Sequence, residues 1–298
     1  GQDLGLSFKA LARAWREDVT SEAIQAELER VAGAAKLWPQ LIAQLSEATD
    51  GLFDPEVVGR LWSRVAVLEE QVGVRPGAGE RAIEAWRKVL AARDDDAPAL
   101  EALERLLAAA QRPAELVRIL ERRAELAPDD DTRKRLHARA AELYESALQQ
   151  EPQAVTAWRN VLAIDDGDAA ALDALERLYE RSEAWRDLSQ TLARKLELGL
   201  GDRRALAFKA AAVHEQRLGD SFEAVTLYKG VLETAPDDGG ALSELDRLYI
   251  KDRNWGDLVE IIDRRAALVS GAERAELRQR AAEVTERELG EAVAAIGR

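Results

Sequence analysis

Apolar residues recur at three- and four-residue steps along most of the chain, which is the spacing of a buried stripe on an α-helix. In residues 239–252, the stripe consists of Leu242, Leu245, Leu248 and Tyr249. Short clusters of Asp, some next to Pro, separate the periodic segments. An Asp side chain can accept hydrogen bonds from the free N–H groups at a helix start. The pattern therefore predicts about sixteen helices of roughly 11–19 residues, joined by loops of about two to five.

One fifteen-residue pattern occurs four times. The copies are ELERVAGAAKLWPQL (27–41), ALERLLAAAQRPAEL (102–116), ALERLYERSEAWRDL (174–188) and ELDRLYIKDRNWGDL (244–258). The core leucine at the second position falls at 28, 103, 175 and 245, so successive copies lie 75, 72 and 70 residues apart. A second pattern starts at 61, 136, 206 and 277, and a third (AIEAWRKVL, AVTAWRNVL, AVTLYKGVL) starts at 82, 154 and 224. The chain is therefore a repeat of about 70 residues, each made of two helical hairpins.

This arrangement resembles the tetratricopeptide repeat family, a helix–turn–helix unit of about 34 residues. The best match is residues 205–238, where Gly219-Asp220 occupies the turn and Pro236 ends the second helix. The resemblance covers roughly residues 20–290. It implies an all-α, right-handed superhelical solenoid of antiparallel helix pairs, which we take to span residues 1–298 as a single domain. The expected double repeats are about 20–93, 94–166, 167–237 and 238–298, the last of them incomplete.

The resemblance fails at one position of the first helix. The family has a small residue directly after the core leucine, whereas this chain has Glu104, Glu176 or Asp246 there. Because a larger side chain keeps neighbouring helices apart, we expect looser contact at this position. The first copy, residues 20–47, is the poorest match to the family.

Composition narrows the classes of partner. The formal charge is −14, from 42 basic and 56 acidic residues. Nucleic acids and anionic lipids bind mainly to basic surfaces, so we expect no nucleic acid among the partners. The chain has no run of about 18 apolar residues, so no membrane insertion is expected. It has no Cys, which fits both cytosol and periplasm, and we favour a cytoplasmic location. Because the chain starts at Gly1 and contains no Met, we expect it to be a segment of a longer repeat protein.

Catalytic and metal-binding patterns are missing from the sequence. The two histidines, His137 and His214, lack the paired spacing of metal ligands, and we expect both to face solvent. The acidic loop at residues 165–168 lacks the length and the final Glu of a calcium loop, which favours a helix cap. No nucleophile-elbow, P-loop or dinucleotide-binding motif is present. We therefore predict no enzymatic activity, no metal and no cofactor.

Tryptophans occur at repeated positions. Trp38, Trp185 and Trp255 stand where second helices begin, while Trp86, Trp158 and Tyr228 share one inward slot of the third pattern. Recurrence at one register position favours packing between helices, and stacking on a ligand is the alternative.

Basic residues also recur at fixed positions. We call Arg30, Arg105, Arg177 and Arg247, each two residues after the core leucine, the first basic row; Arg64, Arg139, Lys209 and Arg280, each three residues after the leucine that opens the second pattern, form the second basic row. The family resemblance implies that both positions line the concave groove in which partners bind. The alternative is that these side chains are ordinary solvated residues paired within their helices.

Three hypotheses for function follow. The first is a non-catalytic protein–protein interaction scaffold that holds a partner peptide or helix in its groove, the partner being acidic or offering a C-terminal carboxylate. The second is a structural repeat segment. Residues 4–16 form a helix without its hairpin partner and residues 272–290 a first helix followed only by AVAAIGR, so the exposed terminal repeats would self-associate. The third is a regulatory arm of a larger multidomain protein.

Overall fold

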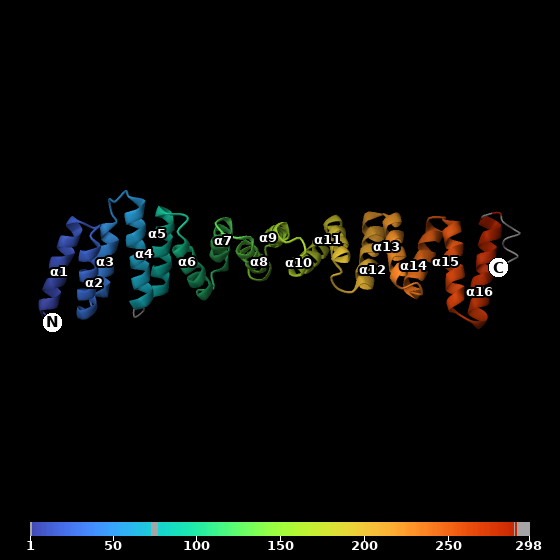
Figure 1. The fold of residues 1–298 in the computed structure, drawn as a ribbon, viewed down its shortest axis with the longest axis horizontal. Coiled ribbons are helices and arrows are strands. Elements are labelled where there is room, and N and C mark those ends of the chain that lie inside the picture. Colours follow the sequence, from blue (N-terminus) through green and yellow to red (C-terminus); the bar gives the residue numbers. More distant parts are fainter. Residues whose placement is uncertain (1, 73–76, 289, 291–298) are drawn as a thin grey trace. The chain divides into compact units, whose positions relative to one another are not determined.

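The computed structural model of the protein describes residues 2–72, 77–288 and 290. Within these ranges the secondary structure is helical, with sixteen α-helices of 11–18 residues, one five-residue π-helix and no strand (Figure 1). The predicted all-α fold is confirmed. The expected stub AVAAIGR lies outside the described residues.

The helices pack as successive antiparallel pairs, each mainly against its neighbours in sequence (Figure 1). Their bounds are α1 (Gln2–Glu17), α2 (Glu22–Ala35), α3 (Trp38–Ala48), α4 (Pro55–Val72), α5 (Ala78–Ala92), α6 (Ala97–Ala109), α7 (Pro113–Glu125), α8 (Asp130–Ser146), α9 (Glu151–Ile164), α10 (Ala169–Arg181), α11 (Trp185–Leu198), α12 (Arg203–Val213), η1 (His214–Leu218), α13 (Ser221–Thr234), α14 (Gly239–Lys251), α15 (Trp255–Leu268) and α16 (Gly271–Glu288). Even-numbered helices are the first helices of hairpins, and the odd-numbered helices from α3 to α15 are the second helices.

The chain divides into two compact units. The N-terminal unit, residues 1–164, contains α1 to α9, and the C-terminal unit, residues 165–298, contains α10 to α16. The division falls two residues before the expected start of the third double repeat at residue 167. None of the described helices combines the length and the apolar character that crossing a membrane requires.

Aspartates start many of the helices. Asp96, Asp168 and Asp238 occupy one repeated position, and the carboxylate of each accepts a hydrogen bond from the backbone N–H three residues later, at 2.9, 3.0 and 2.8 Å. Asp129 and Asp220 do the same for α8 and α13. The predicted capping role is confirmed, including for the acidic loop at 165–168.

A repeated turn joins the two helices of every second hairpin. Lys36, Gln111, Glu183 and Arg253 each lie eight residues after a core leucine and adopt left-handed backbone angles, with φ between 54° and 57°. The following N–H bonds back to the carbonyl five residues earlier, as in the pair Leu37 to Ala32 at 2.8 Å. This is a C-terminal motif that reverses the chain in a fixed way. Side chains at one register position therefore meet similar surroundings in each copy.

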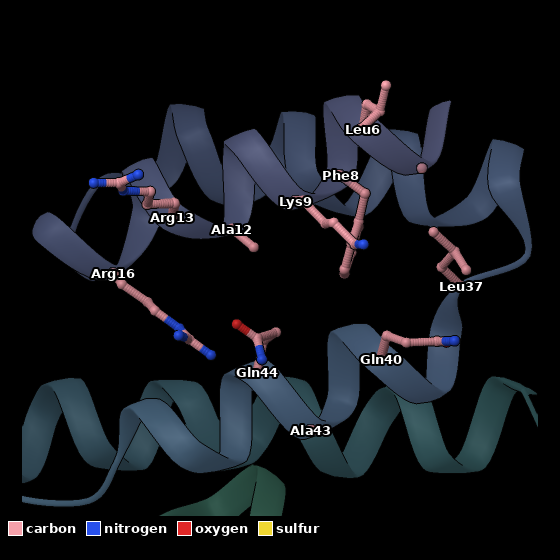
Figure 2. A pocket seen from close by; sticks show the side chains of 11 residues that line it. Leu6, Phe8, Lys9, Ala12, Arg13, Arg16, Leu37, Gln40, Ala43 and Gln44 are labelled. Atoms are coloured by element: carbon pink, nitrogen blue, oxygen red, sulfur yellow. The ribbon is translucent and has the colours of Figure 1, made fainter. Parts of the chain in front are cut away.

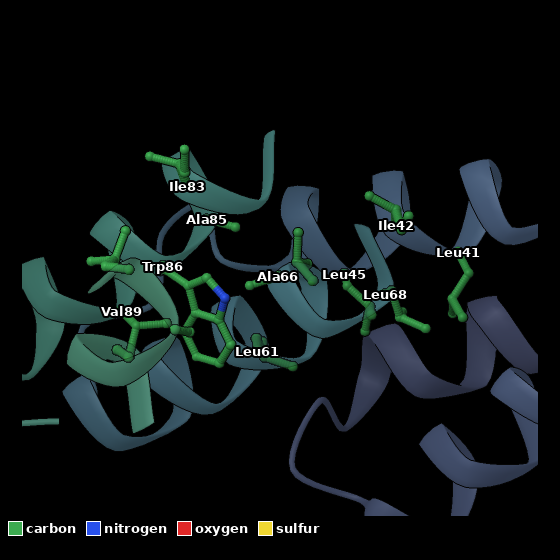
Figure 3. Close-up of a cluster of buried hydrophobic side chains, with 14 of the residues drawn as sticks. Leu41, Ile42, Leu45, Leu61, Ala66, Leu68, Ile83, Ala85, Trp86 and Val89 are labelled. Carbon is green, nitrogen blue, oxygen red and sulfur yellow. The ribbon is translucent and has the colours of Figure 1, made fainter. Parts of the chain in front are cut away.

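A continuous apolar core runs through the N-terminal unit from α1 to α8, and Figure 3 shows part of it. Leu45 of α3, Leu61 of α4 and Trp86 of α5 are among its buried members. Trp158 and Tyr228, at the register position of Trp86, are also buried. The prediction that this slot belongs to the core is confirmed. In the C-terminal unit, Tyr228 packs with a cluster that includes Leu245.

Candidate partner-binding surface

All eight residues of the two basic rows lie on first helices. The first basic row places Arg30 on α2, Arg105 on α6, Arg177 on α10 and Arg247 on α14; the second basic row places Arg64 on α4, Arg139 on α8, Lys209 on α12 and Arg280 on α16. Each compact unit thus carries two members of each row.

Every residue of the second basic row binds a carboxylate of the first helix before it. The bonds are Arg64 to Glu29 at 2.5 Å, Arg139 to Glu104, Lys209 to Glu176 at 2.7 Å and Arg280 to Asp246 at 2.6 Å. These acidic residues directly precede the first-row arginines in sequence, and their side chains are only 6–17% exposed. We call the four contacts the carboxylate bridges. They join first helices that are separated in sequence by one second helix.

Three of these carboxylates bind a second cation, which comes from the second helix of their own hairpin. Glu104 also pairs with Arg123, Glu176 with Lys195, and Asp246 with Arg265. Each of these three carboxylates therefore lies between two positive charges, which offset the cost of removing it from water. These contacts explain why Glu104, Glu176 and Asp246 stand where the family has a small residue. The acidic side chains link neighbouring helices, where looser contact was expected.

The electrostatics of Glu176 follow from this arrangement. Burial alone raises the pKa of its carboxyl group, but the hydrogen bonds from Lys195 and Lys209 outweigh burial, and the net pKa is lowered. The carboxylate stays ionised and keeps both lysines in place.

The first basic row extends further into solvent. The side chains of Arg30, Arg105 and Arg247 are 65, 61 and 48% exposed, against 32–45% for the second row. Each of the three touches a carboxylate nonetheless: Arg30 binds Glu27 of its own helix, and Arg105 binds Glu70 of α4. The first-row guanidinium groups are thus held in position while much of their surface remains in water.

Arg247 binds the carboxylate of Glu215, which lies on η1. Its Nη1 donates to Oε1 of Glu215 at 2.8 Å, and Lys251 donates to the same carboxylate at 3.1 Å. The hydrogen bond from Arg247 is the main cause that lowers the pKa of Glu215 from 4.5 to about 2.

Because the folded state lowers the pKa of Glu215, the free energy of unfolding depends on pH. The folded state gains from ionised Glu215 at any pH above the unfolded pKa of about 4.5, and it loses this gain as the pH falls from there toward 2. We expect the free energy of unfolding of the C-terminal unit to drop over this range. Urea titrations at several pH values should show a shallower drop for Glu215→Gln. Equal slopes in both proteins would contradict the assignment.

The histidines differ from expectation in one case. The Nε2 atom of His214 lies 2.7 Å from Ser189 Oγ on α11, and its Nδ1 atom lies 3.6 Å from a carboxylate oxygen of Asp220. The prediction that His214 faces solvent is wrong, because the chain enters the π-helical turn at this residue and the ring packs against α11. His137 is partly buried, and burial lowers its pKa. No three His, Cys, Asp or Glu side chains gather as a potential metal site in the described ranges.

The architecture places the chain among the helical-hairpin repeat proteins. The model of the tetratricopeptide repeat family matches residues 99–134, which run from α6 through α7 into α8 and contain Arg105. This part of the chain is a tetratricopeptide repeat. Proteins of this family generally serve as protein-interaction scaffolds and are typically non-catalytic.

Among curated proteins, cellulose synthase 2 operon protein C of Komagataeibacter xylinus is 34% identical over 133 residues. The aligned part covers 42% of this chain and 10% of that protein, so the match concerns a small share of the relative's length. Among solved structures, the tetratricopeptide protein YrrB, described as having an unusual peptide-binding site, has 14% identity and a TM-score of 0.35, covering 67% of this chain and 96% of that one. Pseudomonas aeruginosa pilF has 15% identity and a TM-score of 0.32, covering 77% and 94%.

Proposed function

We propose that this chain is a non-catalytic scaffold whose first helices bind an acidic segment or a C-terminal carboxylate of a partner protein. The observation that supports this most directly is the exposure of the first basic row at one register position, with side chains about half in water or more. A planar guanidinium group can donate two parallel hydrogen bonds to one carboxylate, so a regular set of arginines suits an acidic ligand.

The two basic rows have different roles in this proposal. Residues of the second row are occupied by buried carboxylates, so they set the distance between neighbouring first helices. Each buried carboxylate directly precedes a first-row arginine, as Glu104 precedes Arg105 and Asp246 precedes Arg247. The carboxylate bridges therefore fix the backbone from which the first row projects, and a partner meets arginines that are already positioned.

The test removes the first-row charges of one compact unit and leaves those of the other unit in place. An array of acidic peptides, each made with a free C-terminal carboxylate and as a C-terminal amide, provides the probes. For the peptides that bind, we expect Arg30→Gln with Arg105→Gln in the N-terminal unit, or Arg177→Gln with Arg247→Gln in the C-terminal unit, to lower affinity about tenfold or more. Gln is chosen because a reversal to Glu would add repulsion beside the existing carboxylates.

The matched control changes exposed arginines on second helices. Arg118→Gln with Arg186→Gln should leave affinity unchanged. Arg122 and Arg194 also lie on second helices, but they form ion pairs with loop aspartates. Changing them would therefore alter the fold as well as the surface charge. Affinity should also fall between about 50 and 150 mM salt, where the Debye length drops to about 8 Å. If control and first-row variants bind alike, or if no acidic peptide binds, the proposal fails.

A further inference from the structure

Furrows recur along the odd-numbered helices of the described chain. A furrow lined by α7, α8 and α9 has a volume of about 230 Å³, and the furrow between α13 and α15 about 240 Å³. The equivalent furrow between α1 and α3 measures about 900 Å³ (Figure 2). A furrow of this size is within the usual range of ligand-binding clefts, whereas the other two are below it.

The repeat register explains the difference in size. Tyr249, one turn after the core leucine of its copy, lines the furrow between α13 and α15. The first copy has Ala32 at this position, so no large side chain rises from α2 between α1 and α3. The space that is filled in the later copy is left open here.

The furrow between α1 and α3 combines an apolar floor with a cationic wall. Phe8 and Ala12 of α1 are buried members of the core, and Ala43 lines the α3 side. Lys9 and Arg13, one helical turn apart on α1, stand along the furrow, and Figure 2 shows Phe8 and Lys9 reaching into the space between the two helices. The described residues that line it include no Asp or Glu, although the chain as a whole carries a charge of −14. The complementary ligand has an apolar anchor with carboxylates beside it.

The chain carries such a segment. Phe53, in the connection between α3 and α4, is 94% exposed, more than any other large apolar residue in the described ranges. Asp50 precedes it, and Asp54 and Glu56 follow. At this exposure Phe53 does not occupy the furrow of its own chain. The connection therefore presents an aromatic anchor between acidic residues.

We propose that the furrow between α1 and α3 binds residues 50–56 of a second copy of this chain. Phe53 of one copy lies against Phe8 and Ala12 of the other, and its flanking aspartates lie beside Lys9 and Arg13. Each copy offers one furrow and one acidic connection, so a twofold arrangement makes both contacts at once and closes as a dimer. The proposal does not depend on partner binding at the basic rows, because no residue of those rows lines the furrow.

Sedimentation of the 298-residue chain between about 1 and 200 µM tests the proposal. We expect a monomer–dimer equilibrium, in which Phe53→Ala and Arg13→Glu each raise the dissociation constant about tenfold or more. Both sites are exposed, so circular dichroism and the melting temperature should stay unchanged when they are measured at concentrations where wild type and variants are monomeric. Phe222→Ala is the matched control, because Phe222 is 79% exposed and also has acidic neighbours, Asp220 and Glu223.

A mixing experiment identifies the two halves of the contact. The Phe53→Ala protein keeps an intact furrow, and the Arg13→Glu protein keeps an intact acidic connection. Each alone should be monomeric at concentrations where their equimolar mixture forms a heterodimer through one contact. A wild-type chain that stays monomeric to about 200 µM would overturn the proposal. A mixture of the two variants that fails to associate would also overturn it. The same holds if Phe222→Ala weakens the dimer and Phe53→Ala does not.

Discussion

Replacing Trp86 by Ala is expected to lower the free energy of unfolding of the N-terminal unit by about 3–5 kcal/mol. Trp86 is 5% exposed and belongs to the continuous core (Figure 3), so truncation leaves a cavity among close-packed neighbours. Its indole Nε1 also donates to Glu70 at 2.8 Å, a bond that the variant loses. Urea denaturation followed by circular dichroism measures the change.

The repeat supplies an internal comparison for this experiment. Trp158 fills the same register position at the same exposure, but its Nε1 has no acceptor among the described residues. Trp86→Phe should therefore cost more than Trp158→Phe, by about 1.5–3 kcal/mol, the range for a hydrogen bond to a charged group. Equal costs at the two sites would show that the bond to Glu70 adds nothing to stability. A cost below about 1 kcal/mol for Trp86→Ala would contradict its place in the core.

Removing the carboxylate of Glu176 is expected to destabilise the C-terminal unit strongly, because it weakens the pairing of a buried lysine. Glu176→Ala leaves Lys195, whose side chain is 10% exposed, without one of its two carboxylate partners, and Lys209 without its more buried one. We expect a loss of about 3 kcal/mol, the lower end of the range for a broken buried pair, because Lys195 keeps Asp173. Urea melts of the chain measure it.

Two further variants separate burial from charge. Glu180 lies one turn later on α10 and also binds Lys209, at 2.8 Å, but its side chain is 52% exposed. Glu180→Ala should cost no more than about 1 kcal/mol, as for other surface pairs. Adding Lys195→Met to Glu176→Ala should recover much of the lost stability, because an apolar side chain no longer needs a partner. If Glu180→Ala is as harmful as Glu176→Ala, burial does not decide the cost.

The helices and their caps could be predicted from sequence because each depends on residues close together in the chain. Periodic leucines marked the buried stripes, and aspartates such as Asp96 marked the helix starts. The carboxylate bridges were missed because their partners lie on different helices, 33–35 residues apart in sequence. A signal was present, since an acidic residue directly precedes every first-row arginine and a basic residue follows it at that spacing in every copy.

The position of His214 could not be predicted, for a different reason. A π-helical turn contains one more residue than an α-helical turn, which changes the direction of the side chains in it. The sequence around His214 fits an ordinary α-helical pattern equally well. The tertiary contact with Ser189 becomes visible only when α11 and η1 are placed together.

The carboxylate bridges also bear on how the protein opens. In a linear array, stability is the sum of the intrinsic stability of each hairpin and a coupling free energy between nearest neighbours. A bridge contributes to the coupling alone, since it joins one hairpin to the next. Weakening one bridge from its cationic side, as in Arg280→Gln, would keep the bond from Arg265 to Asp246 within the hairpin of α14 and α15, while lowering the cooperativity of this hairpin with α16. Amide hydrogen exchange would then show a step in protection at α16, where a shallow gradient toward the chain end would otherwise be seen.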